Sequence, residues 1–256
     1  MTESERLRLI RDCEALIVAY NEGVLGDIIL PEDTRPVDMT PEQQLVYYTL
    51  PMSLNYRRSS TQLWKAAHES FADDNLSNVY ELERVTCMSE DRLRELLTQR
   101  SLAVQPTRHT QNWRTIAMTI HGKWGGIGQL LAAADHDYLE LSRLVQKAHK
   151  KGFPYLSGPK LFNYWCFILV ERCGIELKND SQIDIAVDVH IRKASARLGL
   201  LTPEEAEKLG APQIAQMWRE VLHGSSIAPM SLNVPLWAWS RGKFLHDPSV
   251  VESTLS

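Results

Sequence analysis

Hydrophobic positions recur along the chain every three or four residues, which is the spacing of one face of an α-helix. In residues 4–20 this stripe is formed by Leu7, Ile10, Cys13, Ile17 and Tyr20. Similar stripes run over 113–120 and 141–148, and residues 160–172 are apolar almost throughout. The pattern predicts helices in all four segments, the last of them buried.

Capping residues mark where several helices should begin and end. Thr40-Pro41-Glu42-Gln43 and Thr202-Pro203-Glu204-Glu205 each combine a capping threonine, a proline at the first helical position and a side chain that can reach back to the cap. Ser89 starts another helix in the same way, and Gly125-Gly126 ends the 113–120 stripe. No segment shows the period-two alternation of paired strands. The sequence therefore predicts an all-α protein of about ten short helices.

Length and loop composition suggest how the helices are grouped. A chain of 256 residues forms one large domain or two small lobes. The loop-like segments 22–39 and 173–186 are candidate crossings between lobes. We expect lobe A to comprise approximately residues 1–45 plus 186–256, and lobe B residues 46–185, as one functional unit over 1–256.

Composition restricts the class of protein. Hydrophobic residues make up 44% and charged residues 23% of the chain, as in ordinary globular proteins. No apolar run approaches the roughly 18 residues that span a bilayer, and the first residues lack the features of a signal peptide. We therefore expect a monomeric cytoplasmic protein, associated with the nucleoid if bacterial. Cys13, Cys87, Cys166 and Cys173 show no C-x-x-C spacing, so we expect buried thiols and neither a metal site nor an iron–sulfur cluster.

Charge is unevenly distributed. The net charge is −4, but residues 143–197 contain ten basic and five acidic residues, whereas residues 1–50 contain four basic and ten acidic ones. Because local rather than total charge attracts a phosphate backbone, this asymmetry slightly favours nucleic-acid binding over a chance fluctuation.

Two segments suggest specific chemistry. In FPYLSGPK, residues 153–160, a short glycine-containing turn opens a helix, and the amides of such a turn can bind phosphate. By spacing alone, a plain interhelical loop is the commoner explanation. In VDVHIRKASARLGL, residues 187–200, Asp188 stands at the mouth of a helix that Gly199 ends. An N-cap aspartate without a catalytic role is the usual explanation for that position.

Together the two segments resemble motifs of the helix-hairpin-helix DNA glycosylase superfamily, which includes endonuclease III and the 8-oxoguanine glycosylases. FPYLSGPK is similar to the family turn L-P-G-x-G-x-K, with Gly158 matching the second glycine and Lys160 the catalytic lysine. VDVHIRKASARLGL is similar to V-D-T-H-V-x-R-x-x-x-R-L-G-L, with Asp188 matching the catalytic aspartate. The resemblance extends over residues 41–245.

The resemblance implies a fold and an activity. The fold would be two helical lobes with the hairpin between them and an active-site cleft at the lobe interface. The activity would be excision of a flipped, altered base from duplex DNA, with Asp188 stabilising positive charge on the sugar and Lys160 forming a Schiff base that permits strand cleavage. The DNA-binding residues would be Tyr155, Ser157 and Gly158 of the hairpin, with Asn55 and Arg57. The last two follow LPMS, residues 50–53, which falls where the family has its L-S-x-Q loop, and for Arg57 a simply solvated side chain stays open.

Other matches concern the base. SLNVPLW, residues 231–237, resembles H-L-D-x-x-L-W of archaeal 8-oxoguanine glycosylases, which implies that Asn233 and Trp237 contact the flipped base. The 28-residue interval from Lys160 to Asp188 is also closest to that branch. No cofactor is implied, although the hairpins of this family often hold a monovalent cation. For His190 and His109, catalysis and a hydrogen-bonded structural role both stay open, the second being commoner for a lone histidine.

The departures leave alternatives open. Leu156 stands where the hairpin's first glycine is expected, Asn233 replaces an aspartate, and the family's iron–sulfur cysteines are absent. One alternative is a monofunctional glycosylase in which Lys160 only binds phosphate. Another is a glycosylase for a bulky modified base, for example in phage DNA, with a role in defence. The third is a non-catalytic DNA-binding module.

Overall fold

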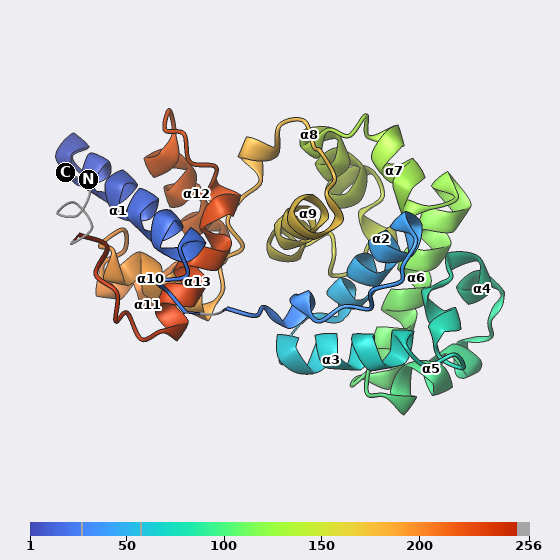
Figure 1. Cartoon of the computed structure of the whole chain (residues 1–256). Coiled ribbons are helices and arrows are strands. Elements are labelled where there is room, and N and C mark those ends of the chain that lie inside the picture. Colours follow the sequence, from blue (N-terminus) through green and yellow to red (C-terminus); the bar gives the residue numbers. More distant parts are fainter. Residues whose placement is uncertain (27, 57, 250–256) are drawn as a thin grey trace. The chain divides into compact units, whose positions relative to one another are not determined.

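The computed structural model describes residues 1–26, 28–56 and 58–249, and it is built from helices (Figure 1). Over these ranges the only β-type pairing is an isolated bridge between Asp137 and Lys178. The predicted all-α class is therefore confirmed. The local start signals act as predicted: Thr40 and Thr202 form capping boxes with Gln43 and Glu205.

The chain divides into two compact units. Unit 1 combines Met1–Ile28 with Asp180–Ser256, and unit 2 is Ile29–Asn179. The divisions lie earlier in the sequence than the expected boundaries after residues 45 and 185. A boundary at residue 45 would fall inside a helix, because Pro41–Thr49 is one continuous element.

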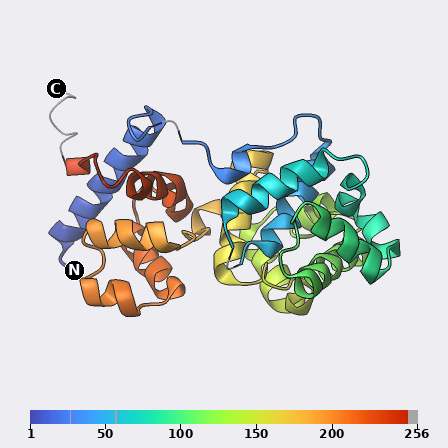
Figure 2. The same ribbon diagram turned by 90° about the horizontal axis from the view of Figure 1, so that it is seen from below.

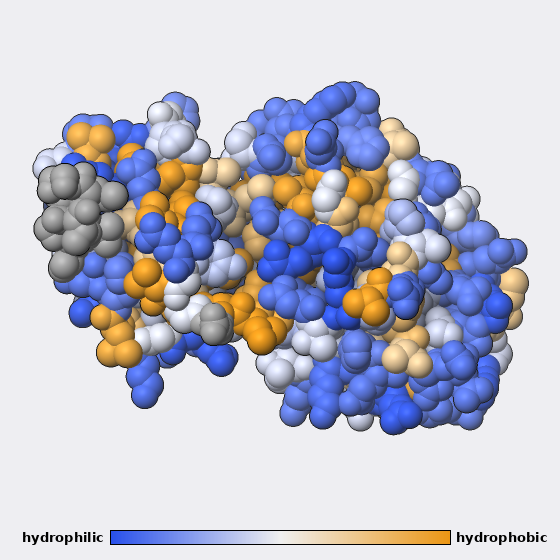
Figure 3. Space-filling view, in the orientation of Figure 1, coloured by the Kyte–Doolittle hydropathy of each residue, from blue (hydrophilic) through white to orange (hydrophobic). Residues whose placement is uncertain are grey.

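Unit 2 contains eight of the α-helices, together with short 3-10 segments and one π-helical segment. The α-helices are α2 (Pro41–Thr49), α3 (Ser60–Phe71), α4 (Leu82–Cys87), α5 (Glu90–Gln99), α6 (Pro106–Trp124), α7 (Ile127–Ala133), α8 (Tyr138–Ser142) and α9 (Pro159–Cys173). The short segments are η1 (Pro31–Asp33), η2 (Pro51–Leu54), η3 (Ser77–Tyr80), η4 (Arg143–Ala148) and η5 (Lys150–Gly152). Hydrophilic residues cover most of the surface formed by α3, α4 and α5 (Figure 3), so their apolar faces are the ones turned inward.

Aromatic side chains fill much of the core of unit 2. Tyr47 of α2 contacts the rings of Trp64 and Tyr80, and Tyr80 meets Trp113 of α6 edge-on. All four are essentially inaccessible to solvent. Their polar atoms are mostly satisfied, since Tyr80 donates to the Ala67 carbonyl and Trp113 to the Val79 carbonyl. Burial of such large side chains is the main stabilisation of this unit.

Helix α9 is anchored in this core at several points. It packs against α2, and the indole N–H of Trp165 donates to the Thr49 hydroxyl at 2.9 Å. The Tyr138 hydroxyl donates to Asn163, whose amide nitrogen donates to the Pro159 carbonyl at 2.8 Å. These contacts fix the first turns of α9, where Lys160 lies. The predicted buried helix over 160–172 is thus confirmed.

Unit 1 brings together the two ends of the sequence. Its helices are α1 (Glu3–Asn21), α10 (Val189–Arg197), α11 (Pro203–Lys208), α12 (Ala211–Leu222) and α13 (Asn233–Arg241), with short segments η6 (Asp180–Gln182) and η7 (Pro229–Leu232). Helix α1 lies beside α12 and α13, although all of unit 2 separates them in the sequence (Figure 2).

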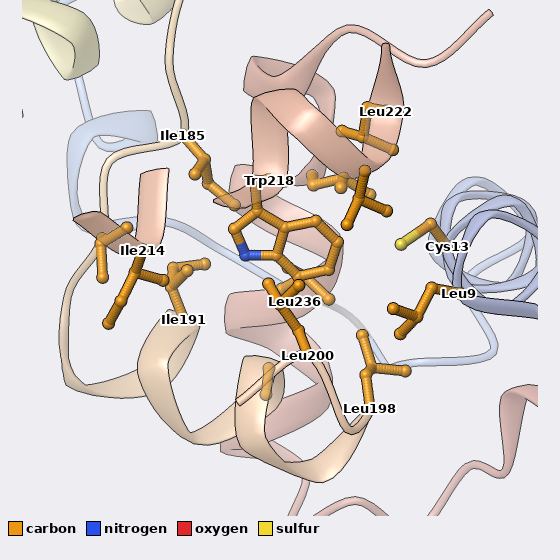
Figure 4. Close-up of a cluster of buried hydrophobic side chains, with 14 of the residues drawn as sticks. Leu9, Cys13, Ile185, Ile191, Leu198, Leu200, Ile214, Trp218, Leu222 and Leu236 are labelled. Carbon is orange, nitrogen blue, oxygen red and sulfur yellow. The ribbon is translucent and has the colours of Figure 1, made fainter. Parts of the chain in front are cut away.

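Trp218 is the centre of the unit 1 core (Figure 4). Its ring is surrounded by aliphatic side chains from α1, α10, α12 and α13. Its indole N–H donates to the buried hydroxyl of Ser195 at 3.0 Å, and that hydroxyl donates to the Ile191 carbonyl. One polar residue inside α10 therefore satisfies the only polar atom of the largest core side chain.

Two predictions need correction. The stripe at 141–148 is not one α-helix: α8 ends at Ser142 and continues as the π-helical segment η4. Cys13 and Cys166 are buried, but Cys87 is exposed because it ends the short helix α4 on its outer side. In the described part of the chain, no helix combines the length and apolar character needed to cross a bilayer.

Candidate functional site

The segment 153–158 of unit 2 forms a tight turn that leads directly into α9. Phe153 and Leu156 are fully buried and anchor the turn. The Ser157 amide donates to the Phe153 carbonyl at 2.9 Å, and the Gly158 amide to the Tyr155 carbonyl at 2.8 Å. A Cβ on Gly158 would lie 3.0 Å from that carbonyl, so the turn is tight enough to favour glycine there.

Tyr155 occupies the left-handed region of backbone space, with φ of +60°. This conformation is uncommon for a bulky residue. Leu156, which aligns with the first glycine of the resembling motif, does not adopt it. The ring of Tyr155 stacks on Tyr56 with centroids 4.9 Å apart and planes 24° apart. This stack joins the hairpin turn to the loop that follows η2.

Lys160 occupies the second helical position of α9 and is exposed. Gly158 caps the helix without a side-chain hydrogen bond, so amides of the first turn remain available. Lys147, Lys150 and Lys151 are also exposed and precede the turn. No ion pair involving these four lysines occurs within residues 1–26, 28–56 and 58–249. Exposed lysines without an ion-pair partner and free helix amides each favour an anion.

Of the two predicted loop residues, the structure describes Asn55. Asn55 follows η2, is half-buried, and its amide nitrogen lies 3.4 Å from the Ser60 hydroxyl. Arg57 lies outside the described residues. Ser157 of the hairpin is buried, and its carbonyl accepts from the Gln146 amide at 3.2 Å.

In unit 1, Asp188 is the N-cap of α10. Its Oδ1 atom accepts hydrogen bonds from the backbone amides of His190 at 2.8 Å and Ile191 at 2.9 Å. The second oxygen, Oδ2, has no partner within the described ranges. The side chain is half-buried. Asp188 thus caps the helix with one oxygen and leaves the other available to a ligand.

Asn233 supports the segment that carries Asp188. It is the first residue of α13 and only 5% exposed. Its Oδ1 accepts from the buried Ala186 amide at 2.8 Å, two residues before Asp188. Its Nδ2 is buried and finds no acceptor in the described structure. The amide oxygen is therefore committed to the fold, and only the nitrogen retains hydrogen-bonding capacity.

Trp237 lies on the next turn of α13 and is half-buried. The His190 ring meets it edge-on, with centroids 5.8 Å apart, and the Arg241 guanidinium lies 4.9 Å from the ring centroid. Trp239, the other tryptophan of α13, belongs instead to the core and donates to the His246 carbonyl. Asp188, His190 and Trp237 are thus gathered where α10 packs against α13.

Two further buried titratable groups of unit 2 are Glu32, which sequence analysis did not single out, and His109, which it did. Glu32 is fully buried, accepts a hydrogen bond from the Tyr164 hydroxyl, and has one carboxyl oxygen without a partner in the described structure. Burial raises the pKa of this carboxyl. His109 is 3% exposed, and burial, with Arg58 and Arg108 nearby, lowers its pKa to about 4. His109 is therefore neutral near pH 7.

Sequence reasoning missed the contacts of His190 and Arg241 with Trp237. The sequence shows that His190 lies in the first turn of α10, close to Asp188. Only the tertiary structure shows that α13 packs against this turn. Among the described residues, no group of three or more histidine, cysteine, aspartate or glutamate side chains is placed to hold a metal ion.

Comparison with known proteins adds no relative: no family model matches the chain, and no curated protein matches it.

Proposed function

We propose that this protein is a DNA glycosylase that excises an altered base from duplex DNA, with an associated lyase activity. The observation that carries the proposal is the state of Asp188: one oxygen caps α10, the other has no partner in the described structure, and His190, two residues on, meets Trp237 of α13 edge-on. The cap uses one carboxylate oxygen, so the second oxygen is available for another role. This arrangement suits an enzyme that must stabilise positive charge on a sugar whose base is held against an aromatic ring.

The proposed reaction begins with cleavage of the bond between C1′ and the base nitrogen. The base leaves with the electron pair and takes up a proton, while positive charge on the sugar is stabilised by Asp188. Lys160 gives up its ammonium proton, its amine attacks C1′, and after loss of a second proton and ring opening it forms an imine. Loss of a proton from C2′ of this imine forms a C2′–C3′ double bond and expels the 3′ phosphate with the electron pair of the C3′–O bond, and hydrolysis of the imine by water then frees Lys160.

Electrostatics on the hairpin side supports DNA as the partner. Lys147, Lys150, Lys151 and Lys160 present four unpaired positive charges within 14 residues, next to the first turn of α9. Each phosphate neutralised by such a cation releases counterions, so binding should weaken as salt is added. We propose that the first amides of α9 contact a phosphate, with Tyr155, Ser157, Gly158 and Asn55 at the edges of the same DNA contact.

The turn itself gives no support to a bound monovalent cation. The carbonyl oxygens of Phe153, Pro154, Tyr155 and Ser157 each already accept an N–H donor. No step of the proposed reaction uses a monovalent cation.

A monofunctional glycosylase is the second candidate, favoured by the position of Lys160. A lysine in the first turn of a helix can bind phosphate without acting as a nucleophile. In that case water would attack C1′, and Asp188 alone would be catalytic.

The test is a screen of duplexes that each carry one altered base: 8-oxoguanine, hypoxanthine, uracil, 5-hydroxyuracil or glucosylated hydroxymethylcytosine. We expect excision from a single class of altered base. If Lys160 is the nucleophile, Lys160→Gln loses strand cleavage; if the enzyme is monofunctional, the wild-type protein excises the base without cleaving the strand and Lys160→Gln still excises it. Absence of excision from every duplex, with DNA binding intact, would favour a non-catalytic module.

A further inference from the structure

His190 makes contacts that differ from those of a purely structural histidine. It is the second residue of α10 and half-buried. Its backbone amide donates to Asp188, its Nδ1 lies 3.2 Å from the Ser240 hydroxyl, and its ring meets Trp237 edge-on. Its Nε2 has no partner within the described ranges. One ring nitrogen is thus held by the protein, and the other remains available.

The Ser240 hydroxyl pairs with one ring nitrogen of His190, and the tautomer sets which of the two atoms donates. Ser240 is 9% exposed, and in the described structure its only hydrogen-bond partner is His190 Nδ1. Other buried helical hydroxyls, such as those of Thr49 and Ser70, donate to the carbonyl four residues earlier, but Ser240 does not. A hydroxyl that donates to Nδ1 satisfies its own proton, and in the tautomer that accepts it Nδ1 carries no proton. Neutral His190 then carries its proton on Nε2 and presents a hydrogen-bond donor.

Trp237 beside this donor is held in one orientation. The His190 and Trp237 rings form a T-shaped pair, and the Arg241 guanidinium lies over one face of the Trp237 ring, so a base would stack on the opposite face. A cation over an indole is stabilised by the ring quadrupole. A ring held in this way can stack a planar base without first losing side-chain entropy, which favours binding.

We propose that His190 is a specificity-determining residue of this protein, whose Nε2–H donates to an acceptor on the edge of the altered base while Trp237 stacks on the base. The substrate class is then a base with an exocyclic carbonyl or an unprotonated ring nitrogen at that edge. Asn233 positions the segment before Asp188, as its bond to Ala186 indicates. The inference rests on the proposed glycosylase function, because it assigns the base-binding part of that site.

The experiment compares two reactions of the full-length protein. The first is single-turnover excision from the duplexes carrying 8-oxoguanine, hypoxanthine, uracil or 5-hydroxyuracil. The second is borohydride trapping on a duplex with a preformed abasic site, which contains no base to recognise. Three variants are used: His190→Phe keeps an edge-on ring without a donor, His190→Gln keeps an amide donor, and Ser240→Ala removes the group that orients Nδ1.

The proposal predicts that the two reactions separate. His190→Phe should lose about 100-fold or more in excision yet trap abasic DNA at the wild-type rate, because a site that donates to its substrate depends strongly on that donor. His190→Gln should recover part of the loss, and Ser240→Ala should lose about tenfold. The matched control is His223→Phe, an exposed histidine in the same unit, which should behave as wild type.

Other outcomes overturn the proposal in distinguishable ways. Equal losses in excision and trapping would make His190 a structural residue of unit 1. If His190→Phe excises the base at the wild-type rate, His190 has no role in base recognition. The proposal also fails if the wild-type protein traps abasic DNA but excises none of the four bases. If the wild-type protein neither excises nor traps, the glycosylase function itself fails.

Discussion

Replacement of Asp188 separates its role as a helix cap from its proposed role in catalysis. Asp188→Asn keeps an oxygen that can accept from the His190 and Ile191 amides, and asparagine caps helices as well as aspartate does. Only the charge is lost, which near the N-terminus of a helix costs about 0.3–1 kcal/mol of stability. Asp188→Ala also loses the cap, at a cost of roughly 0.5–2 kcal/mol.

The effect on catalysis should be much larger. A carboxylate about 4 Å from a sugar that carries a full positive charge contributes about 4 kcal/mol at an effective dielectric constant of about 20. Loss of this stabilisation slows the reaction by about three orders of magnitude. Asp188→Asn and Asp188→Ala should therefore be similarly inactive although they differ in stability.

The assays are single-turnover excision for catalysis and urea unfolding for stability. Thr202→Ala is the matched control, because Thr202 caps α11 in the same unit through the Glu205 amide. It should lower stability to a similar extent and leave excision unchanged. Wild-type excision by Asp188→Asn would refute the reasoning, as would a loss of excision in Thr202→Ala as large as that in Asp188→Asn.

Three further predictions concern stability and DNA binding. The pKa of His109 is about 4 when folded and 6.5 ordinarily, so only the unfolded chain gains a proton as pH falls through 6.5. As the pH falls from 6.5 to 4, the wild-type protein should lose up to roughly 3 kcal/mol of unfolding free energy. The measurement is the urea midpoint at each pH. If the midpoint of His109→Leu falls as steeply as that of the wild type, the prediction is wrong. Asn233→Ala leaves the buried Ala186 amide without an acceptor, so it should lower the unfolding free energy by about 1–3 kcal/mol. An unchanged unfolding free energy would mean that this amide is in contact with water. Lys150→Gln with Lys151→Gln should reduce the slope of log affinity against log salt by about 2, whereas Lys208→Gln, which removes a lysine paired with Glu204, should not change it.

Sequence predicts best where structure depends on neighbours along the chain. Thr40 and Thr202 start helices because their hydroxyls cap amides three residues away, and Gly125 ends α6 because it adopts a φ of +87°. Asp188 was predicted at the mouth of a helix for the same local reason, and it is the N-cap of α10.

Contacts between distant segments could not be predicted. Tyr56 stacks on Tyr155 across about 100 residues of sequence, and Asn233 accepts a hydrogen bond from Ala186 on another element. Nothing in a hydrophobic pattern indicates which elements meet. The pattern at 141–148 is equally consistent with an α-helix and with the wider π-helical segment η4, because both keep the apolar residues near one face.

The buried Glu32 shows a further limit of sequence reasoning. Its position in a loop with Pro31, Asp33 and Pro36 predicts an exposed carboxylate. In the structure it is fully buried against Tyr164 of α9. A single acidic residue in a polar loop carries no signal for burial, since burial depends on a partner more than 100 residues away.

The most direct test of the proposed function is to locate a covalent adduct on the protein. The wild-type protein would be incubated with borohydride and a duplex containing the altered base that it excises, or a preformed abasic site, and the adduct would be mapped by peptide mass spectrometry. The proposal predicts a reduced adduct on Lys160, lost in Lys160→Gln and retained in Lys147→Gln. An adduct on another amine, or none from a protein that excises the base, would contradict Lys160 as the nucleophile.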